Sequence, residues 1–297
     1  LTKTDSSVTM MYKNVSGTLQ PPASGNTLVI GIENITGNVG LQRYSGAPPT
    51  PITNNMALKF YYPRSTTFTV KDAAVSWVDN VTTGGIFKRT GDTLNVSTRI
   101  ANTGNVPTGG TFISSLAIKN SSNVVIHTDS VTVPALNSER DTLMTFTKKF
   151  IPSAAGRYTI TVTTFLTGDA VPSNDIKNLE MNVVTRNSPW YTLAYDNGTN
   201  TGGISWAGGT GAIAMYFVPP VYPARIDTLR YFIAANTSAV TFIAKIYKDD
   251  GAGGLPGTQL YASSPITPTV GAFNAVVVPG AITVTSGGFY VSWVMNG

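Results

Sequence analysis

The chain has 297 residues, of which 42% are hydrophobic and 12% are charged, and its net charge is +5. This apolar content is enough to build packed cores, while basic residues scattered along the chain argue against a nucleic-acid-binding surface. The absence of cysteine excludes disulfides, thiolate metal sites and cysteine nucleophiles, and no apolar run reaches the roughly 18 residues of a membrane helix.

Short runs of alternating or β-branched residues, separated by Gly, Pro and Asn, follow one another along the chain. This period is typical of strands and turns, and a helical period is missing almost everywhere. Strands are predicted at residues 27–34, 57–62, 93–102, 123–133, 142–150, 157–166, 228–236, 240–247 and 288–295. The sequence therefore predicts an all-β protein built from tandem sandwiches.

Three blocks divide these strands. Residues 1–69 hold a few strands between Pro-rich loops and are interpreted as a partial β region, hypothetically an assembly segment. Residues 70–185 carry six or seven strand patterns, the number typical of an immunoglobulin-like sandwich. The run "TRNSPWYT" (185–192) indicates a linker, and residues 193–297 are predicted to form a second β-sandwich.

The middle block contains "ANTGN", "PSAAGRYTITV" and a closing "DAVPSNDIKN". With these marks it resembles a CARDB-type (cell-adhesion-related) immunoglobulin-like domain. The resemblance implies an Ig-like sandwich. The family's closing acidic motif, which pairs with Asn, is matched in part by Asn174, Asp175 and Asn178.

The last block contains "AMYFVPPVYPARIDTLRYFI", "KIYKDDGAGGLPGTQLY" and "AITVTSGGFYVSWVMNG". It resembles a jelly-roll-like module of large secreted bacterial surface proteins, many of which leave the cell by the type IX route. The resemblance implies an extracellular or cell-surface location. In that family the chain continues beyond the position of Gly297, so we expect a fragment or an edge that a partner strand completes.

Asp249 and Asp250 run into a glycine-rich loop, which raises the question of a calcium or phosphate site. An EF-hand loop ends in a bidentate Glu, and a phosphate-binding loop closes with Gly-Lys-Ser/Thr; neither follows here. A hairpin connection is therefore the favoured interpretation, with a loose calcium site at the two aspartates as the alternative.

No other pattern predicts catalysis. His127 is the single histidine, no G-x-S-x-G nucleophile turn is present, and the carboxylates form no recognisable pair. We therefore expect a protein that is not an enzyme and that requires no cofactor.

Aromatic residues and sequons suggest contacts with sugars. Trp190 lies in the linker and Trp206 in a glycine-rich loop, and both are candidate glycan contacts because indole rings stack on sugar faces. Candidate N-glycosylation sequons begin at Asn14, Asn34, Asn80, Asn95, Asn120, Asn197 and Asn236.

The stretch from Gly251 to Gly297 contains no charged residue and no histidine. Such a stretch is poorly protected against association wherever it is exposed, so it either supplies buried strands or meets neighbouring subunits. The preferred hypothesis is a non-catalytic extracellular structural protein, a self-associating subunit of a filament or sheath. The alternative is an adhesin or glycan-binding accessory region of a larger secreted protein or enzyme. No nucleic-acid partner and no membrane span are expected.

Overall fold

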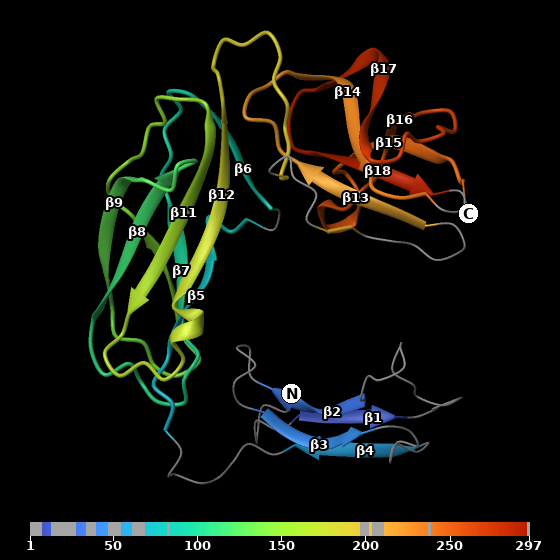
Figure 1. The fold of residues 1–297 in the computed structure, drawn as a ribbon. Helices are drawn as coiled ribbons and strands as arrows, with labels where there is room; N and C mark the ends of the chain where they lie inside the picture. The colour runs from blue at the N-terminus through green and yellow to red at the C-terminus, as the bar shows by residue number, and fades with distance from the viewer. Residues whose placement is uncertain are drawn as a thin grey trace.

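The computed structural model describes residues 8–12, 28–33, 40–46, 55–60, 69–81, 84–196, 202–203, 211–236 and 239–295. Within these ranges the regular structure consists of strands plus two short 3-10 turns, Pro172–Asn174 (η1) and Ala252–Gly254 (η2). The strands gather into antiparallel sheets with one parallel pairing (Figure 1). The all-β fold class predicted from the sequence is confirmed.

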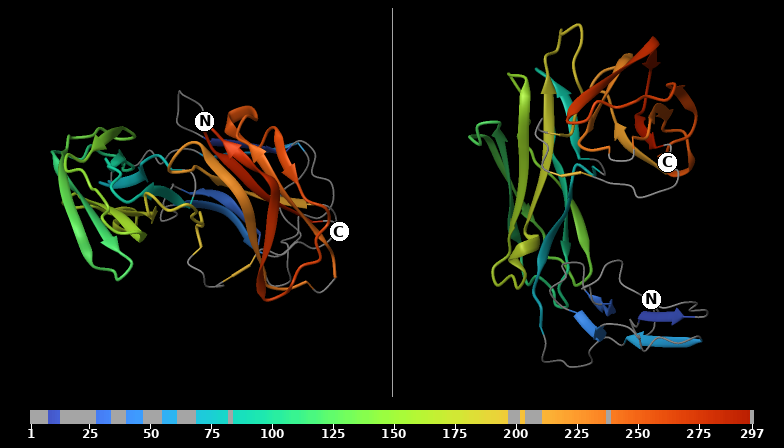
Figure 2. Two further views of the ribbon diagram at one scale, coloured as in Figure 1. Left: turned by 90° about the horizontal axis from the view of Figure 1, so that it is seen from above. Right: turned by 45° about the vertical axis from the view of Figure 1, so that its right-hand side comes forward.

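The N-terminal block forms two small antiparallel ladders in the part that is described. Strand β1 (Val8–Tyr12) pairs with β4 (Met56–Phe60), and β2 (Leu28–Glu33) pairs with β3 (Gly40–Gly46). Figures 1 and 2 draw the two ladders close together, in blue.

The first sandwich is built by the next strands of the chain. They are β5 (Ala73–Val78), β6 (Gly85–Arg89), β7 (Ser97–Asn102), β8 (Phe112–Asn120), β9 (Val125–Val133), β10 (Asp141–Thr145), β11 (Gly156–Phe165) and β12 (Ile176–Val184). In the described residues they form a sheet of order β10-β7-β5 and a sheet of order β6-β12-β11-β8-β9. Alternating residues of each sheet face the other, and their shared core contains Ile100, Leu116, Ile118, Ile160 and Met181.

The "ANTGN" run explains how this sandwich fastens its first strand. Asn105 Oδ1 accepts a hydrogen bond from the Val70 backbone N at 2.7 Å, and the Thr103 hydroxyl bonds the Asp72 carboxylate. A Cβ at Gly104 would collide with the Val70 carbonyl oxygen, so only glycine fits this close approach. The motif thus holds residues 70–72 against the turn that follows β7.

The second sandwich follows after a linker. Its strands are β13 (Gly211–Phe217), β14 (Ala224–Ile233), β15 (Phe242–Lys248), β16 (Gln259–Ala262), β17 (Ala272–Val284) and β18 (Phe289–Met295). Among the described residues, a sheet of order β13-β18-β15-β16 packs against the two-stranded ribbon β14–β17. Leu229, Phe242, Ile246, Val278 and Phe289 are buried between them.

A phenylalanine carried by a strand of the first sandwich is buried in the core of the second. Strands β6 and β12 lie on the side of the first sandwich that faces the second (Figures 1 and 2). Phe87 belongs to β6, yet its ring is buried in the core of the second sandwich. Its ring centroid lies 5.1 Å from that of Tyr195 and 6.2 Å from that of Phe217. Strand β6 therefore belongs to one sandwich by its backbone and to the other by this side chain.

Candidate ligand site between the two sandwiches

A cleft of about 430 Å³ opens where the two sandwiches meet. Small-molecule sites typically have volumes of about 300–1,000 Å³. One wall consists of residues 85–89, from strand β6, with Asp92 and Thr93, and the other consists of Tyr195 and residues 218–220. The first wall carries charge and the second is largely apolar, an arrangement suited to a ligand with both kinds of surface.

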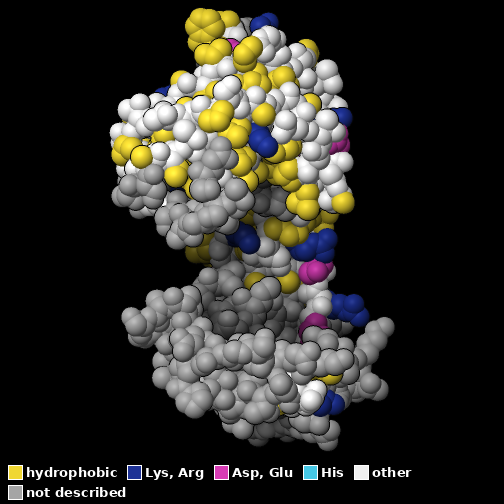
Figure 3. Space-filling model, turned by 90° about the vertical axis from the view of Figure 1, so that its right-hand side faces the viewer, with side chains coloured by type: hydrophobic (Ala, Val, Ile, Leu, Met, Phe, Trp, Pro, Cys, Tyr) yellow, Lys and Arg dark blue, Asp and Glu magenta, His cyan; other side chains and the backbone are white. Residues whose placement is uncertain are grey.

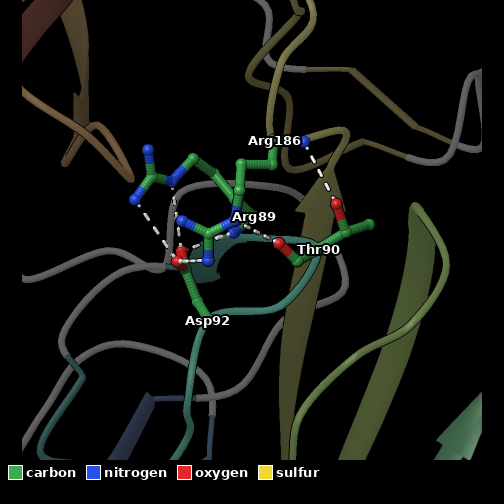
Figure 4. Close-up of polar contacts among 4 residues, drawn as sticks. All are labelled: Arg89, Thr90, Asp92 and Arg186. Carbon is green, nitrogen blue, oxygen red and sulfur yellow. Dashed lines mark hydrogen bonds and ion pairs between the residues drawn. The ribbon is translucent and has the colours of Figure 1, made fainter.

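Two arginines share the Asp92 carboxylate in the turn after β6, as Figure 4 shows. Arg89 lines the cleft, whereas Arg186 is bonded to Asp92 from outside the lining. The side-chain nitrogens of Arg89 lie 3.3 and 3.4 Å from Asp92, and Arg186 Nη2 donates to Asp92 Oδ1 at 2.7 Å. Arg186 also donates through Nε to the Thr90 carbonyl oxygen at 2.9 Å. Asp92 accepts in addition the Arg89 backbone N–H at 2.8 Å. The turn after β6 thus fixes both guanidinium groups.

Positive charge remains after this pairing. Among the described residues that line the cleft, Lys88 and Arg89 are basic and Asp92 is acidic, and Arg186 adds a further positive charge through its bond to Asp92. Outside the lining, Asp79 interacts electrostatically with Lys88. Each guanidinium has five N–H donors, of which two are used by these contacts. The cluster therefore has N–H donors left that can make charge-assisted hydrogen bonds to an oxyanion.

Two pKa values near the cleft reflect this arrangement. Burial alone raises the pKa of Asp92, but hydrogen bonds from Arg89 and the charges of Arg89 and Arg186 outweigh it, so the pKa lies below its ordinary value. Burial raises the pKa of Tyr191, and the nearby charge of Arg89 partly opposes that rise. The positive field of the cluster thus reaches the linker residue Tyr191.

The lowered pKa of Asp92 predicts a pH-dependent contribution to stability. A carboxyl with a depressed folded-state pKa stabilises the fold above its unfolded pKa, and this contribution is lost as the pH falls through the folded pKa. Asp92→Asn should therefore reduce the free energy of unfolding by about 1 kcal/mol at neutral pH. Urea denaturation at neutral pH and at about pH 2 should show that the difference in the free energy of unfolding between wild type and variant shrinks on acidification. An equal difference at both pH values would contradict the ionic origin.

The two aspartates of the glycine-rich loop lie far along the chain from this cleft and bond within the second sandwich. Asp249 Oδ2 accepts the Tyr216 hydroxyl at 2.9 Å and the Gly288 backbone N at 2.7 Å. Asp250 accepts the Thr258 backbone N at 2.6 Å and its hydroxyl at 2.9 Å. The Asp250 contacts close the loop between β15 and β16, and the Asp249 contacts tie it to β13 and to the residue before β18. The calcium alternative stays a prediction. The described residues contain no group of three or more potential metal-ligating His, Cys, Asp or Glu side chains.

The candidate glycan contacts divide between described and undescribed parts of the chain. Trp190 is 77% exposed and precedes Tyr191, whose hydroxyl senses the charge of Arg89. Trp206 lies outside the described residues.

The candidate sequons are spread over all three blocks. Asn80 and Asn95 are exposed, whereas the side chain of Asn236 bonds the backbone of Val240 through both its oxygen and its nitrogen. Asn120 Oδ1 accepts two backbone N–H groups in the turn before β9. Asn14, Asn34 and Asn197 lie outside the described residues. Glycosylation stays a prediction.

The charged wall of the cleft is absent from the sites predicted by the sequence. Its residues come from "GIFKRTGDT" (85–93), whose alternation of apolar side chains is short. The sequence signal that could have indicated this wall is the pair of adjacent basic residues, Lys88 and Arg89, just before a Gly-Asp turn. Strand β6 pairs with β12, about ninety residues later, and that pairing creates the wall.

Comparisons with known proteins give a likeness of fold over part of the chain. No family model and no curated protein matches it. The structure is similar to the crystallised CARDB domain of a Pyrococcus furiosus protein in complex with di-metal ions. That match has 16% identity and a TM-score of 0.31, and covers 40% of this chain and 99% of that one. The solution structure of the same domain matches with 13% identity and a TM-score of 0.30, over 39% of this chain and 98% of that one.

A further similar structure is a Paenibacillus sp. cycloisomaltooligosaccharide glucanotransferase complexed with cycloisomaltoheptaose. The identity is 15% and the TM-score is 0.29, and the match covers 39% of this chain but 14% of that one. The jelly-roll-like assignment of the last block and the export route stay predictions. The described residues form no helix that is long and apolar enough to cross a membrane.

Proposed function

We propose that this protein is a non-catalytic extracellular structural protein whose copies associate through β-sheet surfaces, as in a filament or sheath. The observation that supports the proposal is an apolar strip on the outer face of the β14–β17 ribbon. Val277 is 71% exposed, Phe273 is 41% exposed and Phe232 is 39% exposed. Two of the three lie in the charge-free stretch after Asp250.

The strip is continuous because of the strand register. Phe232 lies opposite Phe273, and Thr228 lies opposite Val277, four residues away along each strand and therefore on the same face. The two phenylalanine rings pack edge to face with centroids 5.2 Å apart, and the Arg230 guanidinium lies 4.7 Å from the Phe273 ring centroid. The side chains are thus held in place while remaining open to water.

Exposed apolar surface of this kind is typical of protein–protein contacts. In the described residues, neither β14 nor β17 pairs with a further strand, so the ribbon also offers its backbone edges. Hydrophobic side chains are spread across the face of the second sandwich that Figure 3 presents. A second copy could cover the strip by sheet-on-sheet packing, in which Arg230 is the charged side chain that the contact would have to accommodate.

Val277→Lys tests this proposal. A lysine placed in an apolar contact must lose its hydration, so we expect self-association to weaken by about tenfold or more. Sedimentation velocity over a range of concentrations would measure it. Ile176→Lys is the matched control, since Ile176 is 54% exposed on β12 of the other sandwich. A wild-type chain that stays monomeric at every concentration, or a variant that associates like wild type, would overturn the proposal.

A second candidate function is glycan binding, as in an adhesin or an accessory region of a larger secreted protein. The observation that favours it is the highly exposed indole of Trp190 in the linker, where it directly precedes Tyr191, a residue whose pKa responds to the charge of Arg89.

A further inference from the structure

We propose that the cleft between the sandwiches binds an acidic glycan, a saccharide that carries carboxylate or sulfate groups, through Lys88, Arg89 and Arg186. The inference rests on the second candidate function and specifies its ligand. It is independent of self-association, because the apolar strip lies on β14–β17 and the cleft lies between β6 and residues 218–220.

The first argument is the preorganised cation cluster. Asp92 and the Thr90 carbonyl oxygen hold both arginine side chains in place before any ligand arrives. Side-chain entropy that is already lost does not have to be lost again on binding. The basic residues that line the cleft, Lys88 and Arg89, are adjacent at the end of β6, although only 12% of the whole chain is charged. A fixed fork of N–H donors suits a carboxylate or sulfate group.

The second argument is the apolar and aromatic surface beside the cations. Val218, Pro219, Pro220 and the ring of Tyr195 line the opposite wall. Trp190 is outside this lining and is exposed in the linker, where we propose that it extends the surface. Sugar rings present C–H faces that pack on indole and proline, and they carry their acidic groups at the ring edge. An acidic sugar therefore matches both halves of the site, whereas a simple anion would use the cations alone.

The size of the cleft favours a short glycan segment over nucleic acid. Single-stranded nucleic acids are bound along grooves that track about 4–16 nucleotides with cations distributed over the backbone. Here the cleft has a volume of about 430 Å³, and Lys88 and Arg89 are the basic residues among the described residues that line it. A few saccharide units meet that footprint, and a phosphate backbone would extend beyond it.

Titration calorimetry on the whole chain tests the proposal. The probes are tetragalacturonate for carboxylates, a chondroitin sulfate tetrasaccharide for sulfate esters, and cellotetraose as the neutral sugar. Inorganic sulfate represents a simple anion, and oligothymidylate and oligoglutamate represent other acidic polymers. We expect heat from one or both acidic sugars, with affinity that falls as salt increases. Binding of both tetrasaccharides would assign a general oxyanion site, and binding of one would identify the acidic group.

Variants locate the binding. Lys88→Gln removes a cation that makes no described hydrogen bond, and Arg186→Gln removes one end of the Asp92 pairing; each should weaken binding about tenfold. Trp190→Ala should weaken it about fivefold, which corresponds to about 1 kcal/mol of stacking. Lys149→Gln, the matched control at an exposed lysine of the first sandwich, should leave affinity unchanged.

The absence of heat with both acidic sugars would overturn the proposal. So would binding of inorganic sulfate, oligothymidylate or oligoglutamate that is as tight as or tighter than that of the acidic sugars. Equal losses of affinity in Lys149→Gln and Lys88→Gln would overturn it as well. Binding of cellotetraose that Lys88→Gln leaves unchanged would also overturn this acidic-ligand assignment, while supporting glycan binding itself. Heat curves that match between wild type and Lys88→Gln, with folding unchanged, would place the binding elsewhere.

Discussion

Phe87→Ala is expected to lower the free energy of unfolding of the second sandwich by about 3–5 kcal/mol. The side chain is 6% exposed, and it packs in the core cluster that contains Phe217, Phe242 and Ile246. Truncation would leave a cavity beside Tyr195 and Phe217, the two rings that contact it. Because the residue is carried by β6 of the first sandwich, the same change should also loosen the connection between the two domains.

Chemical denaturation followed by tryptophan fluorescence would measure this effect. Trp293 packs against the core of the second sandwich and reports on its unfolding. Phe165→Ala is the matched control: Phe165 is 57% exposed on β11, so its removal should change stability by less than about 0.5 kcal/mol. Equal effects of the two substitutions would show that Phe87 does not fill the second core.

Asn102→Ala is expected to cost the first sandwich about 3 kcal/mol, as the sum of several orphaned polar groups. Asn102 is 1% exposed, and its Nδ2 donates to the carbonyl oxygens of Val106 and Leu136 at 2.9 and 3.1 Å. Its Oδ1 accepts the Gly104 backbone N–H at 2.9 Å. Alanine would leave these buried backbone groups without partners and release the turn that holds residues 70–72.

Thermal and urea unfolding of the Asn102 variant would test this expectation. Asn137→Ala, at an exposed asparagine in the loop before β10, provides the comparison and should be close to neutral. An Asn102→Ala protein as stable as wild type would mean that water or relaxed backbone satisfies the abandoned groups.

The all-β class was predictable because alternation over long strands is a local signal. In β11, where a strand was predicted at residues 157–166, every second residue from Tyr158 to Thr164 is buried. "ANTGN" was likewise a usable mark, since a glycine and two asparagines at a strand end are residues with turn-forming chemistry. The contacts that Thr103, Gly104 and Asn105 make with residues 70–72 were not predictable, because residues 70–72 come from an earlier segment of the chain.

The cleft could not be predicted, since its walls depend on pairings between distant segments. Strand β6 has five residues and pairs in parallel with β12, so no hairpin signal marks it. The loop at Asp249 and Asp250 contains one contact that a local pattern predicts and one that depends on a distant segment. Asp250 caps a residue eight positions later, which local turn chemistry suggests, whereas Asp249 reaches Gly288, 39 positions later.

The placement of Phe87 has a consequence for how this chain can be divided. A cut between Val184 and Leu193 follows the linker and separates the strands of the two sandwiches, yet it removes one ring from the interior of the second. The piece that begins after the cut would have a hole facing water, lined by Tyr195 and Phe217. The natural unit of inheritance and of engineering is therefore the pair of sandwiches with strand β6 included, and grafting the second sandwich onto another protein requires a substitute aromatic ring at that place.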